Sequence, residues 1–383
     1  MGKTSNGNSF LRGVFKIVTF VSLFSLLLAY LCPFVHPETF WPLPFFGLAY
    51  PVIMVVVLIL LVIGIFMKSR MVILILVVIA IGGKLHFRSL TFGFDKQELP
   101  EGQEVLKVLN YNVRLFDLYN YVDNKYANRN AIFKYLEEQN ADVICFQEFY
   151  QQDKPTVFPT KDTLMNLLGT KYSHERYSHK LTGRQNFGIA MFSKYPMIAR
   201  GDVMFDDPEN VDNNYCIYAD IVKGLDTFRI YNAHFQSIKF QKDDYAIFGE
   251  NQQQVGVTKS TIRLMLDKLR LAFPKRANQA RKVMEHIEQS PFEVILCGDF
   301  NDTPISYTYN IFYSRFVDAF RNSSSGIGAT YAGKVPAGRI DYIFHSKKLN
   351  SANFLIQKEA HSDHRAIQCE IWKPKTEVPV VVE

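Results

Sequence analysis

Residues 297–304 read CGDFNDTP and directly follow the apolar run Val294–Leu296. The run is typical of a buried β-strand, and Asp299 and Asn301 stand two residues apart where that strand ends. A loop alone would explain two polar residues, because Asp and Asn are common in turns. It would not explain why several other strand ends carry the same kind of side chain.

The chain from residue 105 to residue 374 alternates predicted strands and helices, as expected of one α/β domain. Apolar runs predict strands at 105–113, 141–148, 187–193, 214–222, 228–235, 293–300, 339–346 and 366–372. Helical spacing predicts helices at 129–140 and from Pro274 to a stop at Ser290 and Pro291. A polar linker at 91–104 precedes this domain, and a tail at 375–383 follows it.

Metal-capable or proton-handling side chains stand beside six of these apolar runs. They are Asn112 in LNYNV, Glu148 in VICFQE, His234 in YNAHF, Asp299 and Asn301 in GDFND, Asp341 in RIDYIF, and Asp363 and His364 in SDH. Each has an ordinary structural explanation when it is taken alone, such as a cap, a turn or a salt bridge. Rigid strands hold catalytic geometry best, so six such places in one domain favour a shared site.

The ordered set NYN, QE, NAH, GDFND, RIDY and SDH resembles the endonuclease/exonuclease/phosphatase superfamily, which includes deoxyribonucleases and sphingomyelinases. The resemblance covers roughly residues 104–373. It implies a four-layer αββα sandwich of the deoxyribonuclease I type, with the site at one edge of two packed sheets. It also implies hydrolysis of a phosphodiester or phosphomonoester.

Such hydrolysis needs a water aimed in line with the leaving oxygen, neutralised charge on the nonbridging oxygens, and help for the leaving group. Hard oxygen donors suit Mg²⁺ or Mn²⁺, which keep several waters and take only one or two carboxylates from a protein. The expected metal ligands are Asn112, Glu148 and Asp363.

The family's scheme implies roles for the other polar residues. Asp341 would hold His364 and fix its tautomer, as an oriented base requires. Asp299 would position or deprotonate the attacking water, and Asn301 and His234 would donate hydrogen bonds to the phosphoryl oxygens. Either Asp299 or His364 can take the proton from the water.

Substrate choice depends on the loops between these motifs. Arg184 and Asn186 precede a predicted strand and are candidates for phosphate contacts, and Lys239 lies in the long insertion 236–273. The second half of that insertion is amphipathic, which fits either a helix packed on its own domain or a membrane-facing lid. A lipid head group or small phosphoester is the expected substrate, with an extracytoplasmic nuclease and an inactive membrane-tethered binding module as alternatives.

Residues 1–90 differ from the rest because three segments, 11–32, 43–67 and 71–87, are almost free of charge. About 20 apolar residues cross a bilayer, so the first two segments qualify. The third is short unless Lys84 extends to the interface. A cleaved signal peptide is the alternative for the first segment, but two further apolar segments follow it.

Basic residues orient these spans. Lys3, Arg12 and Lys16 lie near the N-terminus, and Lys68 and Arg70 separate the second and third segments, whereas the link at 33–42 has no Lys or Arg. The positive-inside rule then predicts a multi-pass inner-membrane protein whose domain faces the periplasm. Lys84 and Arg88 weaken this orientation, and a third segment that lies only in the interface would leave the domain in the cytoplasm.

Charge and cysteine content exclude some functions. Residues 1–100 hold eight Lys or Arg and three Asp or Glu, a balance of +5 against +6 for the whole chain, so the remaining 283 residues carry about +1. That domain lacks the basic footprint of a protein that grips duplex DNA. The chain has five cysteines and no CxxC motif, which argues against a zinc cluster or a redox pair.

Overall fold

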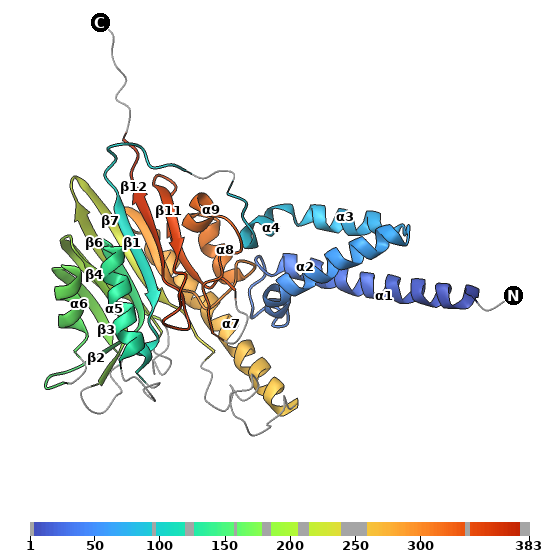
Figure 1. Ribbon diagram of the computed structural model, residues 1–383, viewed down its shortest axis with the longest axis horizontal. Coiled ribbons are helices and arrows are strands. Elements are labelled where there is room, and N and C mark those ends of the chain that lie inside the picture. The colour runs from blue at the N-terminus through green and yellow to red at the C-terminus, as the bar shows by residue number, and fades with distance from the viewer. Residues whose placement is uncertain are drawn as a thin grey trace, which may run out of the picture. The chain divides into compact units, whose positions relative to one another are not determined.

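The computed structural model describes residues 4–93, 97–118, 126–156, 159–177, 185–205, 214–238, 259–333 and 338–375. The chain forms two compact units, which Figure 1 shows in colours that follow the sequence. The helical unit comprises Met1–Leu90 together with Asp302–Asn310, and the sandwich unit comprises Thr91–Asn301 and Ile311–Glu383.

The sandwich unit contains two six-stranded sheets. The first has the order β11 (Asn350–Ile356), β12 (Ile367–Trp372), β1 (Leu106–Asn112), β2 (Val143–Gln152), β4 (Gln185–Ser193) and β3 (Tyr172–Tyr177). The second has the order β5 (Met197–Val203), β6 (Tyr215–Lys223), β7 (Asp226–His234), β8 (Glu293–Asp299), β10 (Asp341–His345) and β9 (Val317–Asp318). Both sheets are mixed, because β1 runs parallel to β2 and β7 runs parallel to β8.

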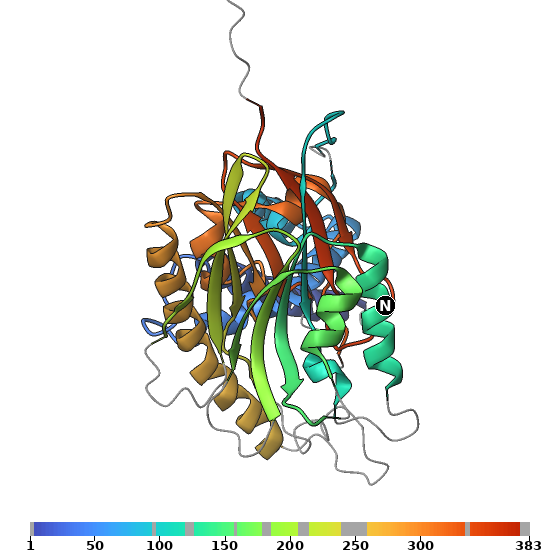
Figure 2. The ribbon, with the colours of Figure 1, turned by 90° about the vertical axis from the view of Figure 1, so that its left-hand side faces the viewer.

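An apolar core fills the space between the two sheets, with Val108 and Ile189 from the first facing Ile230 and Ile295 from the second. Helices α5 (Ala127–Gln139) and α6 (Lys161–Leu168) cover the outer face of the first sheet through a separate cluster. Figure 2 shows α7 (Lys259–Ile287) on the opposite side of the strands. The predicted four-layer αββα sandwich is therefore confirmed.

The prediction that a helix begins at Pro274 is wrong, because α7 begins at Lys259 and runs through that proline. Leu269, Phe273 and Ala277 are buried along one continuous face. Their packing on the sheet outweighs the backbone hydrogen bond that proline cannot make. The end before Pro291 is confirmed, since α7 stops at Ile287.

Strands β3, β5 and β11 were not predicted from the sequence. Strands β3, β5 and β11 lie at or beside the edges of their sheets, and much of β3 and β5 is exposed or half-buried. Strands with one exposed face lack the continuous apolar run by which the central strands were recognised. The remaining short elements are η1 (Arg114–Asp117), α8 (Tyr307–Tyr313) and α9 (Ala319–Ser323).

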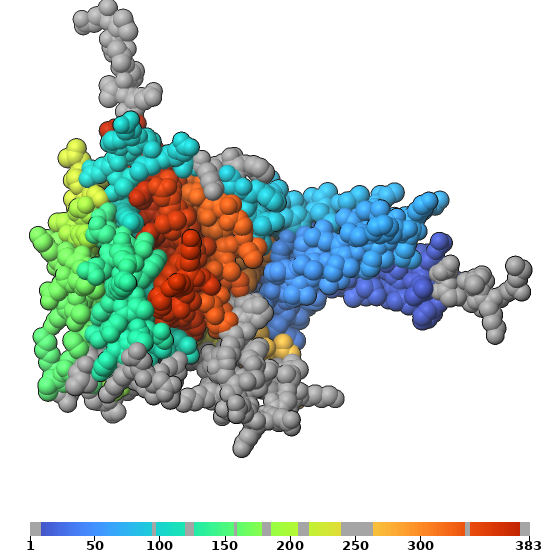
Figure 3. Space-filling view, viewed as in Figure 1, coloured from blue at the N-terminus to red at the C-terminus, as the bar shows by residue number. Residues whose placement is uncertain are grey.

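The helical unit contains α1 (Thr4–Leu31), α2 (Leu43–Phe66), α3 (Met71–Ile81) and α4 (Gly83–Ser89). Among the described residues, two helices are long and apolar enough to cross a membrane, Ser9–Leu31 and Leu43–Phe66. The pair α3 and α4 passes the same test only as one span bent by 68°. Many large apolar side chains of these helices are exposed, and they form much of the blue surface in Figure 3.

A buried amide network joins the two sheets. Gln147 on β2 donates through Nε2 to Asn232 Oδ1 on β7 at 2.6 Å and to Asn110 Oδ1 on β1 at 2.7 Å. Asn232 Nδ2 in turn donates to the main-chain oxygens of Phe146 and Ala190, both at 3.0 Å. The contacts of Asn232 therefore cross from the second sheet to the first.

The exchange Asn232→Ala is expected to lower the free energy of unfolding by about 2 kcal/mol, because buried groups of the first sheet lose their partner. Denaturant unfolding of the detergent-solubilised chain, followed by circular dichroism, measures the change. Asn186→Ala is the matched control, since Asn186 makes an exposed hydrogen bond to Asp153. This exchange should change the free energy of unfolding by no more than about 0.5 kcal/mol. Equal losses in both variants would contradict the structural role of the network.

Candidate active site

The register of the second sheet brings three predicted site residues to one level. His234 on β7 pairs with Asp299 on β8, and Asp341 on β10 pairs with the same Asp299 from the other side. Residues directly opposite each other on neighbouring strands point to the same face of a sheet. These three side chains therefore converge, although they are far apart in the sequence.

Gly298 in the CGDFNDTP stretch makes this close alignment possible. A Cβ atom at Gly298 would lie 2.2 Å from the main-chain oxygen of Ala233 on β7. Any larger residue would push β7 and β8 apart directly beside the pair His234 and Asp299. The glycine before Asp299 is thus required by strand packing.

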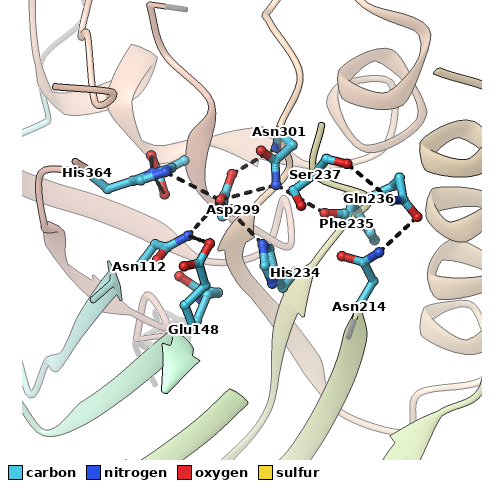
Figure 4. A network of polar contacts seen from close by, with 12 residues as sticks. Asn112, Glu148, Asn214, His234, Phe235, Gln236, Ser237, Asp299, Asn301 and His364 are labelled. Atoms are coloured by element: carbon cyan, nitrogen blue, oxygen red, sulfur yellow. Dashed lines mark hydrogen bonds and ion pairs between the residues drawn. The ribbon is translucent and has the colours of Figure 1, made fainter. Parts of the chain in front are cut away.

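The Asp299 carboxylate is the centre of the hydrogen-bond network in Figure 4. Its Oδ1 accepts from the backbone N–H of Asn301 at 2.8 Å. Its Oδ2 accepts from Asn112 Nδ2 at 3.0 Å and from Asn301 Nδ2 at 3.3 Å, and His234 Nε2 lies 3.7 Å away. Asn301 has a φ of 52°, so the turn after β8 brings its side chain back toward Asp299.

His364 lies between two buried carboxylates. Its Nδ1 is 2.9 Å from Asp341 Oδ2, and its Nε2 is 3.7 Å from Asp299 Oδ2. Burial by itself lowers the pKa of His364, but the charges of Asp341 and Asp299 outweigh it and hold that pKa well above the usual value. Burial raises the pKa of Asp299, with Asp341 adding to the rise and His364 opposing it.

The first sheet contributes Asn112 and Glu148. Glu148 has a φ of 49° and lies where the pairing of β2 with β4 shifts between Phe146 and Phe149. A bulge of this kind interrupts the alternation of side chains along a strand and redirects one of them. Asn112 Nδ2 donates to Glu148 Oε1 at 3.3 Å as well as to Asp299, so one amide links the two sheets at the site.

The turn that follows Asn112 sets the orientation of its side chain. Its Oδ1 accepts from the backbone N–H of Arg114 at 3.1 Å, which turns Nδ2 toward Glu148 and Asp299. Asn112 therefore donates hydrogen bonds to both carboxylates in this geometry, and its role as a metal ligand stays a prediction. The physical reason for this orientation is that only the oxygen of the amide can accept from a backbone N–H.

The residues after Asn112 form a left-handed turn. Arg114, Leu115, Phe116 and Asp117 have φ values of 43°, 55°, 55° and 59°. Such a run is costly for residues with a side chain, and the buried Phe116 ring, packed on Phe133 and Phe149, offsets the cost.

The turn places Arg114 Nε 3.6 Å from Asp363 Oδ2, beside a cavity. This cavity has a volume of about 340 Å³ and is lined by Arg114, Asp117, Asn128, Ala332, Gly333, Ala360, His361, Ser362 and Asp363. It is as large as the smaller clefts that bind small molecules. Because it includes Asp363, it adjoins the polar network at the strand ends.

The carboxylates fit a divalent cation. Burial and then the negative charge of Asp363 raise the pKa of Glu148 to about 7, so a positive charge beside Glu148 would favour its ionised form. Asp299, Asp341 and His364 also offer donor atoms within 4.8 Å of one another. We favour Glu148 and Asp363 as ligands, because His364 already bonds to Asp341 and such pairs orient an imidazole.

Of the other predicted substrate contacts, Asn186 is the one among the described residues. Asn186 pairs with Gln151, three positions past Glu148 on β2, and its Nδ2 donates to Asp153 Oδ1 at 2.9 Å. Arg184 and Lys239 lie outside the described residues.

Sequence reasoning missed several polar residues near the site. Gln236 follows His234 by two positions, accepts from Asn214 Nδ2 at 2.9 Å, and accepts through its main-chain oxygen from Arg276 Nε at 2.6 Å. Arg114 and His361 line the cavity. Their only signal in the sequence is proximity to the motifs NYN and SDH, which does not reveal that they share a cavity.

Two family models match the chain. The model of the endonuclease/exonuclease/phosphatase family matches residues 109–364, and a domain of unknown function (DUF8431) matches residues 12–89. No curated protein matches the chain.

Solved structures resemble the sandwich unit in fold. An endonuclease/exonuclease/phosphatase from Bacteroides vulgatus is 15% identical with a TM-score of 0.50, covering 71% of this chain and 100% of its own. The human Nocturnin catalytic domain with bound sulfate is 16% identical with a TM-score of 0.49, covering 70% and 95%. A family protein from Leptotrichia buccalis is 19% identical with a TM-score of 0.49, covering 69% and 98%.

The residues that the family model matches contain the second sheet, the first sheet apart from β12 and the start of β1, and every member of the polar network. The chain therefore belongs to the endonuclease/exonuclease/phosphatase family and is a hydrolase that acts on phosphoester bonds.

Proposed function

We propose that the chain is a membrane-anchored, divalent-metal-dependent phosphoesterase that hydrolyses its substrate by in-line attack of water. The observation that supports this most directly is that three side chains from separate parts of the chain converge on Asp299. They are the amide of Asn112 and the imidazoles of His234 and His364. A buried carboxylate surrounded by donors suits a water molecule and a phosphoryl group side by side.

Asp299 is the proposed proton acceptor. Its raised pKa makes it a better base than an exposed aspartate, and its neighbour His364 already holds a proton between two carboxylates. His364, oriented by Asp341, then stabilises charge on the phosphoryl group or the leaving oxygen. Asn301 and His234 donate hydrogen bonds to the nonbridging oxygens, which gain charge in the transition state.

Glu148 and Asp363 are the proposed metal ligands, and Asn112 orients Glu148 by its hydrogen bond. A bound Mg²⁺ or Mn²⁺ would neutralise charge on the nonbridging oxygens of the phosphate. The half-buried Glu148 and its neighbour Asp363 supply the hard oxygen donors that these ions prefer.

A lipid head group or small phosphoester is the proposed substrate. The cavity carries both charges, with Arg114 on one hand and Asp117 and Asp363 on the other. Such a lining suits a polar group attached to the phosphate. An extracytoplasmic nuclease is the second candidate. The family membership favours a nuclease, whereas the near-neutral charge of the domain argues against one.

A metal-binding prediction follows from Glu148. Mg²⁺ or Mn²⁺ should raise the melting temperature of the solubilised chain, because binding to the folded state stabilises it. In Glu148→Gln this rise should disappear, since the uncharged amide is a poor ligand. Glu138→Gln on the exposed face of α5 is the matched control and should keep the rise. An unchanged metal response in Glu148→Gln would place the metal elsewhere.

Catalytic predictions concern Asp299 and His364. Asp299→Asn and His364→Gln should each lower kcat about 10³-fold, because a positioned acid or base accelerates a reaction by a factor of this order. The substrates are model phosphomonoesters and phosphodiesters, supplied with Mg²⁺ or Mn²⁺. His174→Gln on the edge strand β3 should leave kcat near wild type, and a chelator should abolish activity. Hydrolysis of DNA or RNA alone would select the nuclease alternative. Full activity in Asp299→Asn would end the proposed mechanism.

We propose that the sandwich unit lies outside the cytoplasm. Lys68 and Arg70 separate α2 from α3, whereas the connection from α1 to α2 has no Lys or Arg. The positive-inside rule places Lys68 in the cytoplasm. The bent pair of α3 and α4 then has to cross the membrane as a third span.

Cysteine labelling tests this topology. The five native cysteines are buried, so a single introduced cysteine reports its own side of the membrane. A membrane-impermeant maleimide applied to right-side-out vesicles should label Thr39→Cys and Leu225→Cys, whereas Lys68→Cys should react only after permeabilisation. If Thr39→Cys is labelled and Leu225→Cys is not, the chain has two spans and the sandwich unit lies in the cytoplasm.

A further inference from the structure

The segment Asp302–Asn310 follows the active-site residue Asn301 directly, yet it packs within the helical unit. Ile305 is only 1% exposed and belongs to the same apolar cluster as Leu26, Tyr50 and Val57 of the first two helices. The chain therefore leaves the polar network for the helices at Asp302 and returns at Ile311. An ordinary surface loop of a soluble enzyme would not bury an isoleucine in this way.

The contacts of this segment concentrate on the connection between α1 and α2. A Cβ atom at Gly47 would lie 2.4 Å from the main-chain oxygen of Ile305 and 2.5 Å from Cys32 Sγ. The rings of His36 and Tyr307 meet edge to face at 5.1 Å. We call these five residues, Cys32, His36, Gly47, Ile305 and Tyr307, the clasp.

The connection that forms one half of the clasp has the composition of a membrane interface. Phe34, Phe40 and Trp41 are exposed there, and the link from 33 to 42 has no Lys or Arg. Aromatic side chains, above all Trp and Tyr, gather at the level of the lipid head groups. The clasp therefore lies near that level when α1 and α2 cross a bilayer.

Helix α8 carries the attachment toward the site. Tyr307 at its start belongs to the clasp, and Phe312 near its end stacks on Phe235 at 6.1 Å with an angle of 8° and lies 5.1 Å from Phe300. Phe235 follows His234, and Phe300 separates Asp299 from Asn301. The same short helix thus touches the residues beside the catalytic groups.

Chain length sets an upper limit on the distance involved. Asn301 stands four residues before Ile305, and four residues span at most about 14 Å when fully extended. That length is about twice the thickness of one head-group region, since about 10 to 15 Å of polar material is divided between the two faces of the hydrocarbon core.

We propose that the clasp fixes the catalytic centre at the membrane surface, so that the enzyme acts on phosphoester groups of lipids in its own bilayer. This inference rests on the proposed function and names its substrate class. It also requires the α1–α2 connection and the sandwich unit to share one side of the membrane, which makes the bent pair α3 and α4 a span.

The clasp supports access to the substrate rather than the chemistry itself. The turn at Asp299 and Asn301 is held from within the sandwich unit, because Asn301 N–H donates to Asp299 Oδ1 and Phe300 N–H donates to the main-chain oxygen of Ile340 at 2.9 Å. Loosening the clasp should therefore leave the polar network intact. It should reduce the effective concentration of bilayer lipid at the site.

The experiment compares two forms of one phosphoester. The full chain is reconstituted in phosphatidylcholine vesicles that contain either phosphatidic acid or phosphatidylglycerol, and it is also supplied with the soluble dihexanoyl analogues. Wild type should prefer the bilayer lipid, and Gly47→Ala should lower the ratio of bilayer to soluble turnover by about tenfold. Gly13→Ala on α1 is the matched control, because a Cβ atom there has nothing within 4 Å.

Tyr307→Leu provides a second variant that removes the ring contact with His36 without adding a clash. It should shift the ratio in the same direction as Gly47→Ala, and retained soluble turnover shows that each variant is folded. Two outcomes would overturn this inference and leave the proposed function standing. In the first, wild type hydrolyses model phosphoesters or nucleic acid but shows no preference for bilayer lipid. In the second, Gly47→Ala and Gly13→Ala have equal ratios of bilayer to soluble turnover. Loss of all metal-dependent hydrolysis in wild type would instead overturn the proposed function.

Discussion

Two buried carboxylates on neighbouring strands, Asp299 and Asp341, impose the constraint on which the site depends. Like charges this close in a buried place are unfavourable unless a positive group stands beside them. His364 is that group, since its two ring nitrogens face one carboxylate each. The segment before the last strand, β12, therefore has to bring His364 back beside β8 and β10.

The site lies where the backbone departs from regular structure. Glu148, Asn301 and Arg114 all have positive φ, and each follows or interrupts a buried strand. Residues with a side chain adopt this conformation at a cost, so neighbouring contacts must hold them there. Here the contacts are the hydrogen bonds of Asn112 and Asp299 and the packing of Phe116. The rigid strands fix where the side chains of the site begin, and these irregular residues determine where the side chains point.

The helical unit contributes more than an anchor if the clasp acts as proposed. All of the sandwich unit follows residue 90, but the segment Asp302–Asn310 returns to the helices directly after the catalytic turn. A tether at one end would hold the enzyme near the membrane in any orientation, whereas a second attachment beside Asn301 restricts which face meets the lipid. The buried Ile305 and the glycine at position 47 are the local signs of that attachment.

The sequence by itself determined the layered α/β class and the apolar N-terminal helices, because buried strands and membrane helices need continuous apolar runs. It also determined the set of eight polar residues, because they stand where those apolar runs end. It did not reveal the bulge at Glu148, the hydrogen bonds that Asn112 donates to two carboxylates, the passage of α7 through Pro274 or the burial of Ile305. Each of these depends on partners distant in the chain, such as Asp299 Oδ2 for Asn112 and Gly47 for Ile305. Local patterns report what a residue prefers, and only tertiary packing decides which partner it meets.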